Sequence, residues 1–161
     1  MQTSPRQGRG PQGPLQVATF LVGELRVGVQ IHCVQEITRQ LALAHVAHAP
    51  ACVRGVMNLR GEVVTVIDPR VVLGMSPAVC GKLSRNVIIQ FDDELIGLWV
   101  DEVLDILSIP EADIEPPPAN INSVDGRFFV GVYSQAGHII TLLDLDAVLT
   151  SGCEYASESS G

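Results

Sequence analysis

One segment of the chain occurs twice, and this repeat limits the fold more than any other feature of the sequence. Residues 61–73 read GEVVTVIDPRVVL, and residues 137–149 read GHIITLLDLDAVL. The two segments share the residues at these aligned positions: Gly61 and Gly137, Thr65 and Thr141, Asp68 and Asp144, and a final Val-Leu pair. Each segment begins with a run rich in Val and Ile, which is typical of β-strands. The sequence therefore predicts two copies of one small β unit.

The similarity continues upstream, at a slightly different offset. The aligned pairs are Gly55-Val56 with Gly131-Val132, Leu25 with Leu95, Gly28 with Gly97, Val34 with Val103, Glu36 with Asp105, and Ile37 with Ile106. Arg60 lies at the tight break before the first Val-rich run and is aligned with Ala136. Any role that depends on the charge of Arg60 therefore belongs to the first copy alone.

The other apolar runs are short and regularly spaced. They predict strands over residues 17–22, 25–31, 62–67, 86–91, 95–100, 103–109, 128–133 and 138–143. Asp68 and Asp144 each follow a predicted strand and precede a short helical turn, where an N-cap Asp is favoured. Combined with the repeat, this pattern predicts a mainly β fold. We expect two small five-stranded β-barrels, packed side by side around an apolar core and carrying short helices.

Residues 15–150 are predicted to form a single domain made of two intertwined β subdomains, because a chain of 161 residues suits one compact unit. The segments at the two ends, residues 1–14 and 151–161, are polar or rich in Gly and Pro. They contain too few apolar residues to offset the entropy lost on ordering, so we expect disordered tails.

The charge of the chain argues against some classes of partner. The net charge is −8, which excludes a typical nucleic-acid-binding protein. Residues 15–74 contain five basic and four acidic side chains, whereas residues 75–150 contain three basic and twelve acidic ones. This asymmetry indicates either that the two halves face different partners or that the second half has a solvated acidic surface.

No apolar run approaches the roughly 18 residues that a membrane-spanning helix needs, and Gly and Pro interrupt any signal-peptide core. We therefore expect a cytoplasmic protein without direct membrane insertion. The four cysteines have no CxxC spacing and are expected to be free in a reducing compartment. They are Cys33, Cys52, Cys80 and Cys153.

The sequence gives little support for an enzyme or a metal site. Asp68 and Asp144 could be paired catalytic carboxylates, but helix capping explains both positions. The chain has neither a GxSxG elbow nor a GxxxxGK[ST] phosphate loop. His45 and His48 have no acidic or Cys partner at ligand spacing. We expect no metal and no cofactor. Two adjacent barrels would leave a groove lined by Val and Ile, which suits the apolar tip of a helix, so the pattern favours a binding module.

Three stretches closely resemble the CheW family of chemotaxis coupling proteins. They are VQEI at residues 34–37, RGVMNLRG at residues 54–61 with the Val-rich strand after it, and GLWVDEV at residues 97–103. The resemblance covers about residues 15–150, and the distance between the first two motifs is specific to the family. Thr65 stands where the family usually has Pro, and Pro69 where it usually has Leu. Both positions tolerate either residue.

This resemblance implies two SH3-like β subdomains and a non-enzymatic adaptor of two-component signal transduction. Such a scaffold joins a CheA-type histidine kinase to the cytoplasmic tips of chemoreceptors, the methyl-accepting chemotaxis proteins. In that family one subdomain docks on the regulatory domain of the kinase, and the groove between the subdomains takes the receptor helix. The residues that match the receptor- and kinase-binding positions of the family are Val34, Glu36, Ile37, Gly55, Asn58, Arg60 and Gly61.

Two alternatives stay open. One is a CheW-like adaptor of a pilus-motility or other chemosensory-like kinase pathway. The other is a small-barrel enzyme or ligand-binding protein that uses the acidic half. An adaptor would retain a receptor or a kinase from a lysate, whereas a ligand binder would show a thermal shift with a small molecule. The sequence does not identify the receptor, the kinase or the motility system.

Overall fold

The computed structural model describes residues 13–152 and is mainly β. The predicted disordered tails lie almost wholly outside the described residues. The strands of the first half of the chain are β1 (Leu15–Val22), β2 (Leu25–Gln30), β3 (Val34–Arg39), β4 (Val53–Leu59) and β5 (Glu62–Ile67). Those of the second half are β6 (Arg85–Phe91), β7 (Glu94–Val100), β8 (Glu102–Ile109), β9 (Asn120–Ile121), β10 (Val124–Asp125), β11 (Phe129–Gln135) and β12 (His138–Leu143).

The helices are short. They are α2 (Pro69–Val72), the 3-10 turns η1 (Ile31–Cys33), η2 (Glu111–Asp113) and η3 (Gly126–Phe128), and the π-helical turn η4 (Ala147–Gly152). Asp68 caps α2 by accepting a hydrogen bond from the backbone N–H of Arg70 at 3.0 Å. Asp144 accepts one from the N–H of Ala147 at 3.1 Å. Both aspartates therefore cap helical turns, as the sequence predicted.

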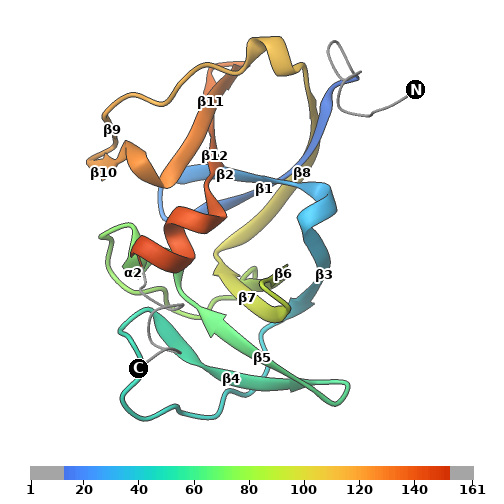
Figure 1. The fold of residues 1–161 in the computed structure, drawn as a ribbon, viewed down its shortest axis with the longest axis vertical. Helices are drawn as coiled ribbons and strands as arrows, with labels where there is room; N and C mark the ends of the chain where they lie inside the picture. Colours follow the sequence, from blue (N-terminus) through green and yellow to red (C-terminus); the bar gives the residue numbers. More distant parts are fainter. Residues whose placement is uncertain (1–12, 153–161) are drawn as a thin grey trace.

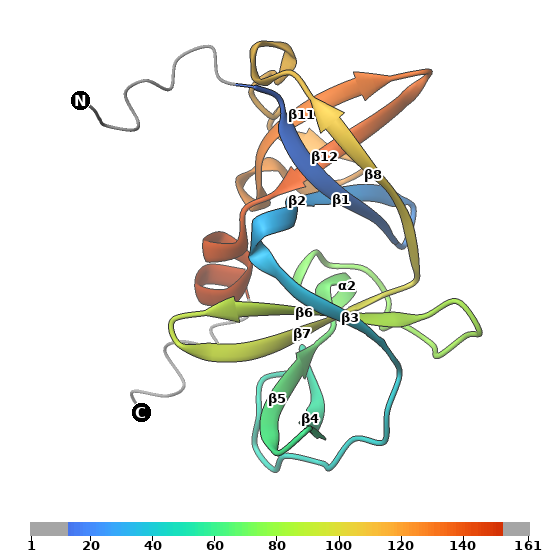
Figure 2. The same ribbon diagram turned by 90° about the vertical axis from the view of Figure 1, so that its right-hand side faces the viewer.

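The ten longer strands form two five-stranded sheets. Sheet A has the order β11-β12-β2-β1-β8, and sheet B has the order β3-β6-β7-β5-β4 (Figure 1). The side view shows sheet A above sheet B, with β3 descending to sheet B and β8 rising to sheet A (Figure 2). The predicted count of two sheets of five strands is confirmed. Each sheet as paired has two edge strands, so closure into barrels stays a prediction.

The two sheets have the same internal order when the repeat is applied. Hairpin β1–β2 corresponds to β6–β7, β3 to β8, and hairpin β4–β5 to β11–β12. Gly28 and Gly97, which align in the sequence, occupy equivalent places: each pairs with a parallel strand, opposite Leu142 and Val66 respectively. The repeat is thus a structural repeat.

The strands of one half of the sequence do not all lie in the same sheet, however. Residues 15–74 supply β1 and β2 to sheet A but β3, β4 and β5 to sheet B, and the second half is divided in the complementary way. Strand pairs within a half are hairpins only. The pairs β1–β8, β2–β12, β3–β6 and β5–β7 all join one half to the other. The acidic excess of the second half is therefore distributed over both sheets, and it does not mark one of them.

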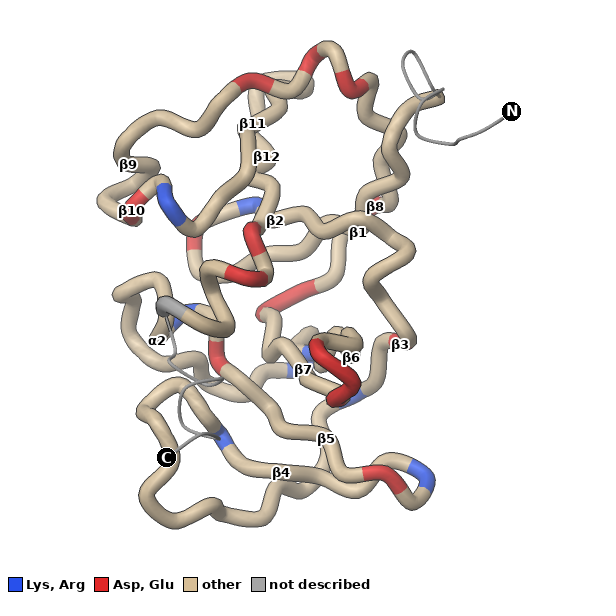
Figure 3. The backbone as a smooth tube through the Cα atoms, viewed as in Figure 1, with Lys and Arg blue, Asp and Glu red and all other residues tan. Residues whose placement is uncertain are grey.

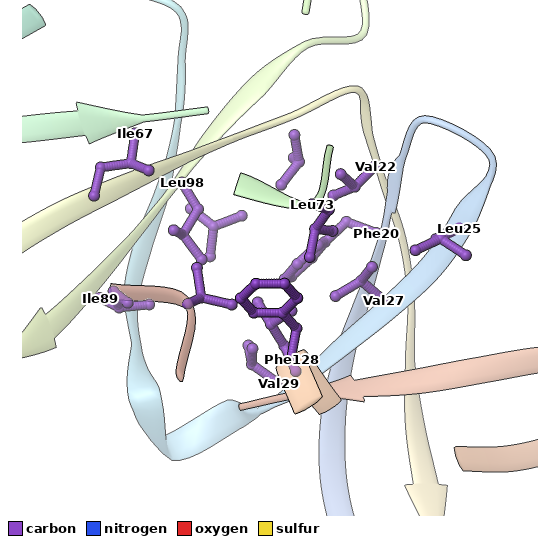
Figure 4. Packing of buried hydrophobic residues seen from close by; sticks show 14 of the residues in the cluster. Phe20, Val22, Leu25, Val27, Val29, Ile67, Leu73, Ile89, Leu98 and Phe128 are labelled. Carbon is purple, nitrogen blue, oxygen red and sulfur yellow. The ribbon is translucent and has the colours of Figure 1, made fainter. Parts of the chain in front are cut away.

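The main core lies where the two sheets face each other (Figure 4). Phe20 and Val27 of sheet A are fully buried there against Ile89 and Leu98 of sheet B, and Phe128 joins them before β11. Each such side chain stabilises the fold by about 1.5–3 kcal/mol through removal from water. A smaller cluster of buried apolar side chains comes mainly from sheet B, and another comes from sheet A. The predicted apolar core between two β units is confirmed.

Asp68 does more than cap a helix. Its side chain is fully buried, and Oδ2 accepts hydrogen bonds from Arg54 Nη1 at 2.9 Å and from the Ala78 backbone N–H at 2.8 Å. Arg54 also donates to the Ala78 carbonyl at 2.9 Å and lies 4.3 Å from the centre of the Trp99 ring. This ion pair, whose carboxylate is fully buried, fixes β4 to the segment after α2. Sequence reasoning did not find it.

Among the three described cysteines, one departs from expectation. Cys33 and Cys80 are free, as predicted, but buried Cys52 is disulfide-bonded. The expectation of four free thiols is therefore wrong at Cys52, because spacing along the chain does not show which sulfur atoms the fold brings together. Cys153 lies outside the described residues.

We expect Asp68→Ala to lower the free energy of unfolding by about 3 kcal/mol, because it leaves Arg54 and a buried N–H without their acceptor. The matched control is Asp144→Ala, at the equivalent repeat position, where only a cap is lost and about 1 kcal/mol is expected. Urea unfolding of both variants measures the difference. Equal losses would show that the buried ion pair adds nothing to the cap.

The thiols should react with iodoacetamide in a fixed order. Burial raises the pKa of the Cys33 thiol, so less thiolate is present at neutral pH and its alkylation should speed up as the pH rises. Exposed Cys80 should react first, and Cys52 should react only after reduction. Mass spectrometry of timed samples at several pH values tests this order. Faster labelling of Cys33 than of Cys80 at neutral pH would contradict it.

Candidate functional site

A hollow of about 690 Å³ opens on sheet B, between edge strand β3 and the β4–β5 turn. Its lining is rich in charge, with the carboxylates of Glu36, Glu62, Asp93 and Glu94 and the guanidinium of Arg60. Figure 3 shows these acidic segments beside β7 and at the β4–β5 turn, next to a basic one. The apolar part of the lining consists of Leu59, Val63, Ile88 and Leu95, and the rest is polar: Gln35, Thr65 and Gln90.

Arg60 is the first residue of the two-residue turn that joins β4 to β5. Its φ is +54°, and Gly61 follows with φ +89°. Such turns match the twist of a hairpin but require positive φ at both positions. The aligned turn of the repeat has the same form, with Ala136 at +49° and Gly137 at +84°. The repeat therefore sets this backbone conformation, and the charge of Arg60 is not needed to form it.

Asn58 stabilises this turn through its side chain. The Oδ1 atom of Asn58 accepts a hydrogen bond from the Gly61 backbone N–H at 3.0 Å. This contact ties the last residues of β4 to the turn on which Arg60 lies. Asn58 is exposed but does not line the hollow, so the structure gives it a supporting position.

Glu36 reaches Arg60 from the opposite wall. A register shift between Val34 and Glu36 marks a β-bulge in β3, and bulges commonly re-aim side chains. Arg60 Nη1 donates to Glu36 Oε2 at 3.2 Å, and Nη2 donates to Oε1, so the pair is bidentate. The hydrogen bond and the charge of Glu36 raise the pKa of the Arg60 guanidinium, which stays charged at every pH of interest.

The ion pair is open to solvent. The side chains of Arg60 and Glu36 are 68% and 33% exposed. Exposed pairs contribute little to stability because water screens them and the long side chains lose entropy. Val63, beside the pair, is 67% exposed. The arrangement is a preset charged group next to an uncovered apolar side chain on rigid strands, which suits contact with another macromolecule.

The other predicted site residues, Val34, Ile37 and Gly55, do not line the hollow. Ile37 is 40% exposed on β3, one residue after Glu36. Val34 packs against the main core. Gly55 is buried with φ +146°, and a Cβ there would lie 2.6 Å from the Ala44 carbonyl oxygen. Gly55 therefore allows close packing of β4 on the preceding segment, and it does not line the hollow.

Sequence reasoning missed the wall formed by β6 and β7. The sequence placed Asp93 and Glu94 only between the predicted strands 86–91 and 95–100, and Leu95 only at the start of the second. They reach the hollow because β5 pairs in parallel with β7, where Val64 lies opposite Leu95. No sequence signal specifies that pairing, since consecutive strands are the more frequent neighbours. The repeat could have suggested it only if the pairing of one copy had been known.

The described residues contain no group of three or more His, Cys, Asp and Glu side chains placed to hold a metal ion. Within residues 13–152, no helix is long and apolar enough to cross a membrane. The site consists of the Arg60–Glu36 ion pair, the apolar side chains of the hollow and the other carboxylates that line it.

Comparisons with known proteins agree on one family. The model of the CheW-like domain matches residues 16–153. The chain is 35% identical to the chemotaxis protein CheW of Rhizobium meliloti (strain 1021) over 139 residues, which covers 86% of this chain and 90% of that protein. It is 32% identical to Protein FrzA of Myxococcus xanthus, over 85% of this chain and 86% of that one. The crystal structure of scaffolding protein TtCheW from Thermoanaerobacter tengcongensis is similar with a TM-score of 0.78. That match has 28% identity and covers 84% of this chain and 88% of that one.

We expect Arg60→Ala to leave the melting temperature within a few degrees of the wild-type value, with a cooperative transition. Ala136 shows that alanine adopts this turn in the same molecule. Calorimetry measures the effect, and Arg60→Gly is the control for backbone strain, since Gly takes positive φ freely. Unfolding of Arg60→Ala but not of Arg60→Gly would show that the backbone is limiting. Unfolding of both would show that the ion pair is structural.

Proposed function

The chain belongs to the CheW family of chemotaxis coupling proteins, and from this premise we propose that its Arg60–Glu36 surface contacts the partners that it couples. The role is that of a scaffold in chemotaxis signal transduction, which joins chemoreceptors to a CheA-type histidine kinase without catalysing a reaction. The observation that carries the proposal is the exposed, bidentate Arg60–Glu36 pair, which lies at a turn whose backbone form recurs around Ala136 without a charge.

The physical case for binding rests on preorganisation. Glu36 holds the guanidinium in one place at the edge of the hollow, so a partner need not order a free side chain. Arginine beside an apolar surface is a frequent hot spot, since its flat group contributes both packing and hydrogen bonds. Val63, which lines the hollow and is exposed, supplies the adjacent apolar surface. The remaining carboxylates make the hollow negative, which favours a partner surface with cationic side chains.

We further propose that the kinase and the receptor bind at different surfaces. The face of sheet B that bears Arg60 and Glu36 docks on the regulatory domain of the kinase. The receptor helix lies in the groove between the subdomains. Sheet B carries the charged hollow. A second hollow of about 500 Å³, whose lining includes Val29, Leu142 and Leu145, opens beside sheet A and has no residue of a sheet B strand in its lining.

One alternative pathway has its own support. Protein FrzA of Myxococcus xanthus is nearly as similar to this chain as the Rhizobium meliloti CheW protein is. The same adaptor could therefore serve a different chemosensory-like kinase pathway, including one for pilus motility. Purification of the tagged protein from its own cells, followed by identification of the kinase that it retains, distinguishes the two pathways.

We expect Arg60→Ala and Glu36→Ala each to weaken assembly with receptor and kinase by about tenfold or more, because both remove a central charged contact. The matched control is Arg127→Ala. Arg127 is another exposed arginine beside a carboxylate, Asp125, but it belongs to the segment before β11. Kinase activation in reconstituted receptor clusters and titration with the isolated kinase measure the losses.

A double variant with reversed charges distinguishes a direct contact with the partner from a contribution to the stability of the protein. In Glu36→Arg with Arg60→Glu the pair can re-form with opposite polarity, so stability should stay normal. Binding should remain weak, since the partner meets the wrong charge at each position. Full kinase activation by this variant, or by Arg60→Ala, would contradict the proposed contact.

A further inference from the structure

Two arginines of sheet B lie directly opposite each other. Arg39 of β3 pairs in register with Arg85 of β6, and like charges at such cross-strand positions destabilise a sheet. None of the ion pairs within residues 13–152 includes either arginine, or Lys82 in the loop before β6. Positive charge is therefore gathered at this end of β6 without neutralisation by a described carboxylate, although the net charge of the chain is −8.

The equivalent pair of the repeat, in sheet A, is neutral. Arg39 lies five residues after Val34, and Ser108 lies five residues after Val103. Val34 and Val103 are aligned in the repeat, so Ser108 is the counterpart of Arg39. Ser108 pairs in register with Gln16 of β1, which corresponds to β6, and Gln16 Nε2 donates a hydrogen bond to Ser108 Oγ at 3.0 Å. The same ladder position is thus satisfied by a polar pair in one copy and occupied by two like charges in the other.

Arg85 is fixed to the backbone of the loop before it. Its Nη1 atom donates hydrogen bonds to the carbonyls of Lys82 at 3.0 Å and Ser84 at 2.8 Å. The loop is closed by the Gly81 N–H, which donates to Ser84 Oγ at 2.9 Å. Only Nη1 takes part in the bonds of Arg85, so Nη2 and Nε keep N–H groups for the bidentate contact that a carboxylate prefers.

Exposed apolar side chains flank the three cations. Leu83, next to Lys82, is 56% exposed, and Leu41, two residues after Arg39, is 43% exposed. We call Arg39, Lys82 and Arg85 with these two leucines the basic patch. None of its residues lines the charged hollow, which lies at the other end of β6. Arginine beside exposed apolar side chains is typical of protein–protein contacts.

We propose that the basic patch binds an acidic segment of a protein partner that also carries apolar side chains. Carboxylates of the segment complement the cations of the patch, and its apolar side chains cover the two leucines. An anionic lipid surface or a nucleic acid fits less well, because each is an extended negative surface and meets the net charge of −8 of the whole chain. A short segment meets only the local positive charge.

The test transfers the neutral pair of sheet A to sheet B, through Arg39→Ser with Arg85→Gln. The melting temperature should equal or exceed the wild-type value, because a like-charge pair is removed. The probe is a labelled synthetic peptide of Glu, Leu and Gly, with a Gln-for-Glu peptide as its control. In fluorescence anisotropy the full chain should bind the Glu peptide alone, and the double variant should bind it about tenfold more weakly or worse.

The matched control variant is Arg127→Gln, since Arg127 is an exposed arginine that already has a carboxylate partner, Asp125. Its affinity for the peptide should stay at the wild-type value. Equal binding by the wild type and the folded double variant would overturn the proposal. So would tighter binding of phosphatidylserine vesicles or duplex DNA than of the peptide, if the double variant loses that binding. The patch would then serve a lipid or a nucleic acid.

A second measurement needs no substitution, because Lys82 is the only lysine of the chain. Saturating Glu peptide should slow acetylation of the Lys82 amine by a succinimidyl ester several-fold, while the N-terminal amine reacts at an unchanged rate. Mass spectrometry of timed samples measures both rates. Unchanged acetylation of Lys82 would overturn the proposal, whether or not the double variant folds. These experiments contain neither kinase nor receptor, so they do not depend on the contact proposed for Arg60 and Glu36.

Discussion

The fold depends on the interleaving of the two halves of the chain. The parallel pairs β2–β12 and β5–β7 each join strands from different halves, and so do the antiparallel pairs at the edges. The main core is filled only when both halves are present, because Phe20 comes from the first and Leu98 from the second. The burial that stabilises the protein is therefore non-local, and the apolar surface of each half needs the other half as its cover.

The candidate site is a consequence of the same constraint. Arg60 and Glu36 come from the first half, but the floor and far wall of their hollow come from β6 and β7 of the second. The site is built on strands and a two-residue turn, so its charged pair is held more rigidly than it would be on a long loop. A scaffold that positions two partners benefits from such rigidity, because flexible contacts would lose entropy when the assembly forms.

The sequence predicted the fold class, the repeat, most strands, both helix caps and the turn that carries Arg60. These features follow from local patterns: alternating Val and Ile, an Asp after a strand, and a Gly at positive φ. It predicted intertwined subdomains, but not which strands of each half join which sheet, nor that Arg54 pairs with the buried Asp68, nor that Cys52 is disulfide-bonded. Each of these depends on which distant segments meet, and local pattern carries no information about that.

The repeat also separates structural charge from functional charge, because each copy is an internal control for the other. Asp68 and Asp144 are aligned and both cap a helical turn, so the capping role belongs to the shared fold. Asp68 in addition is fully buried and paired with the partly exposed Arg54, and loss of that partner would leave the Asp68 charge in the core. Arg60 shows the opposite pattern: its aligned residue is Ala136, in the same turn, and its own charge faces solvent. A charge that the fold does not need, held in place by Glu36 at the edge of a hollow, is better explained by recognition than by stability.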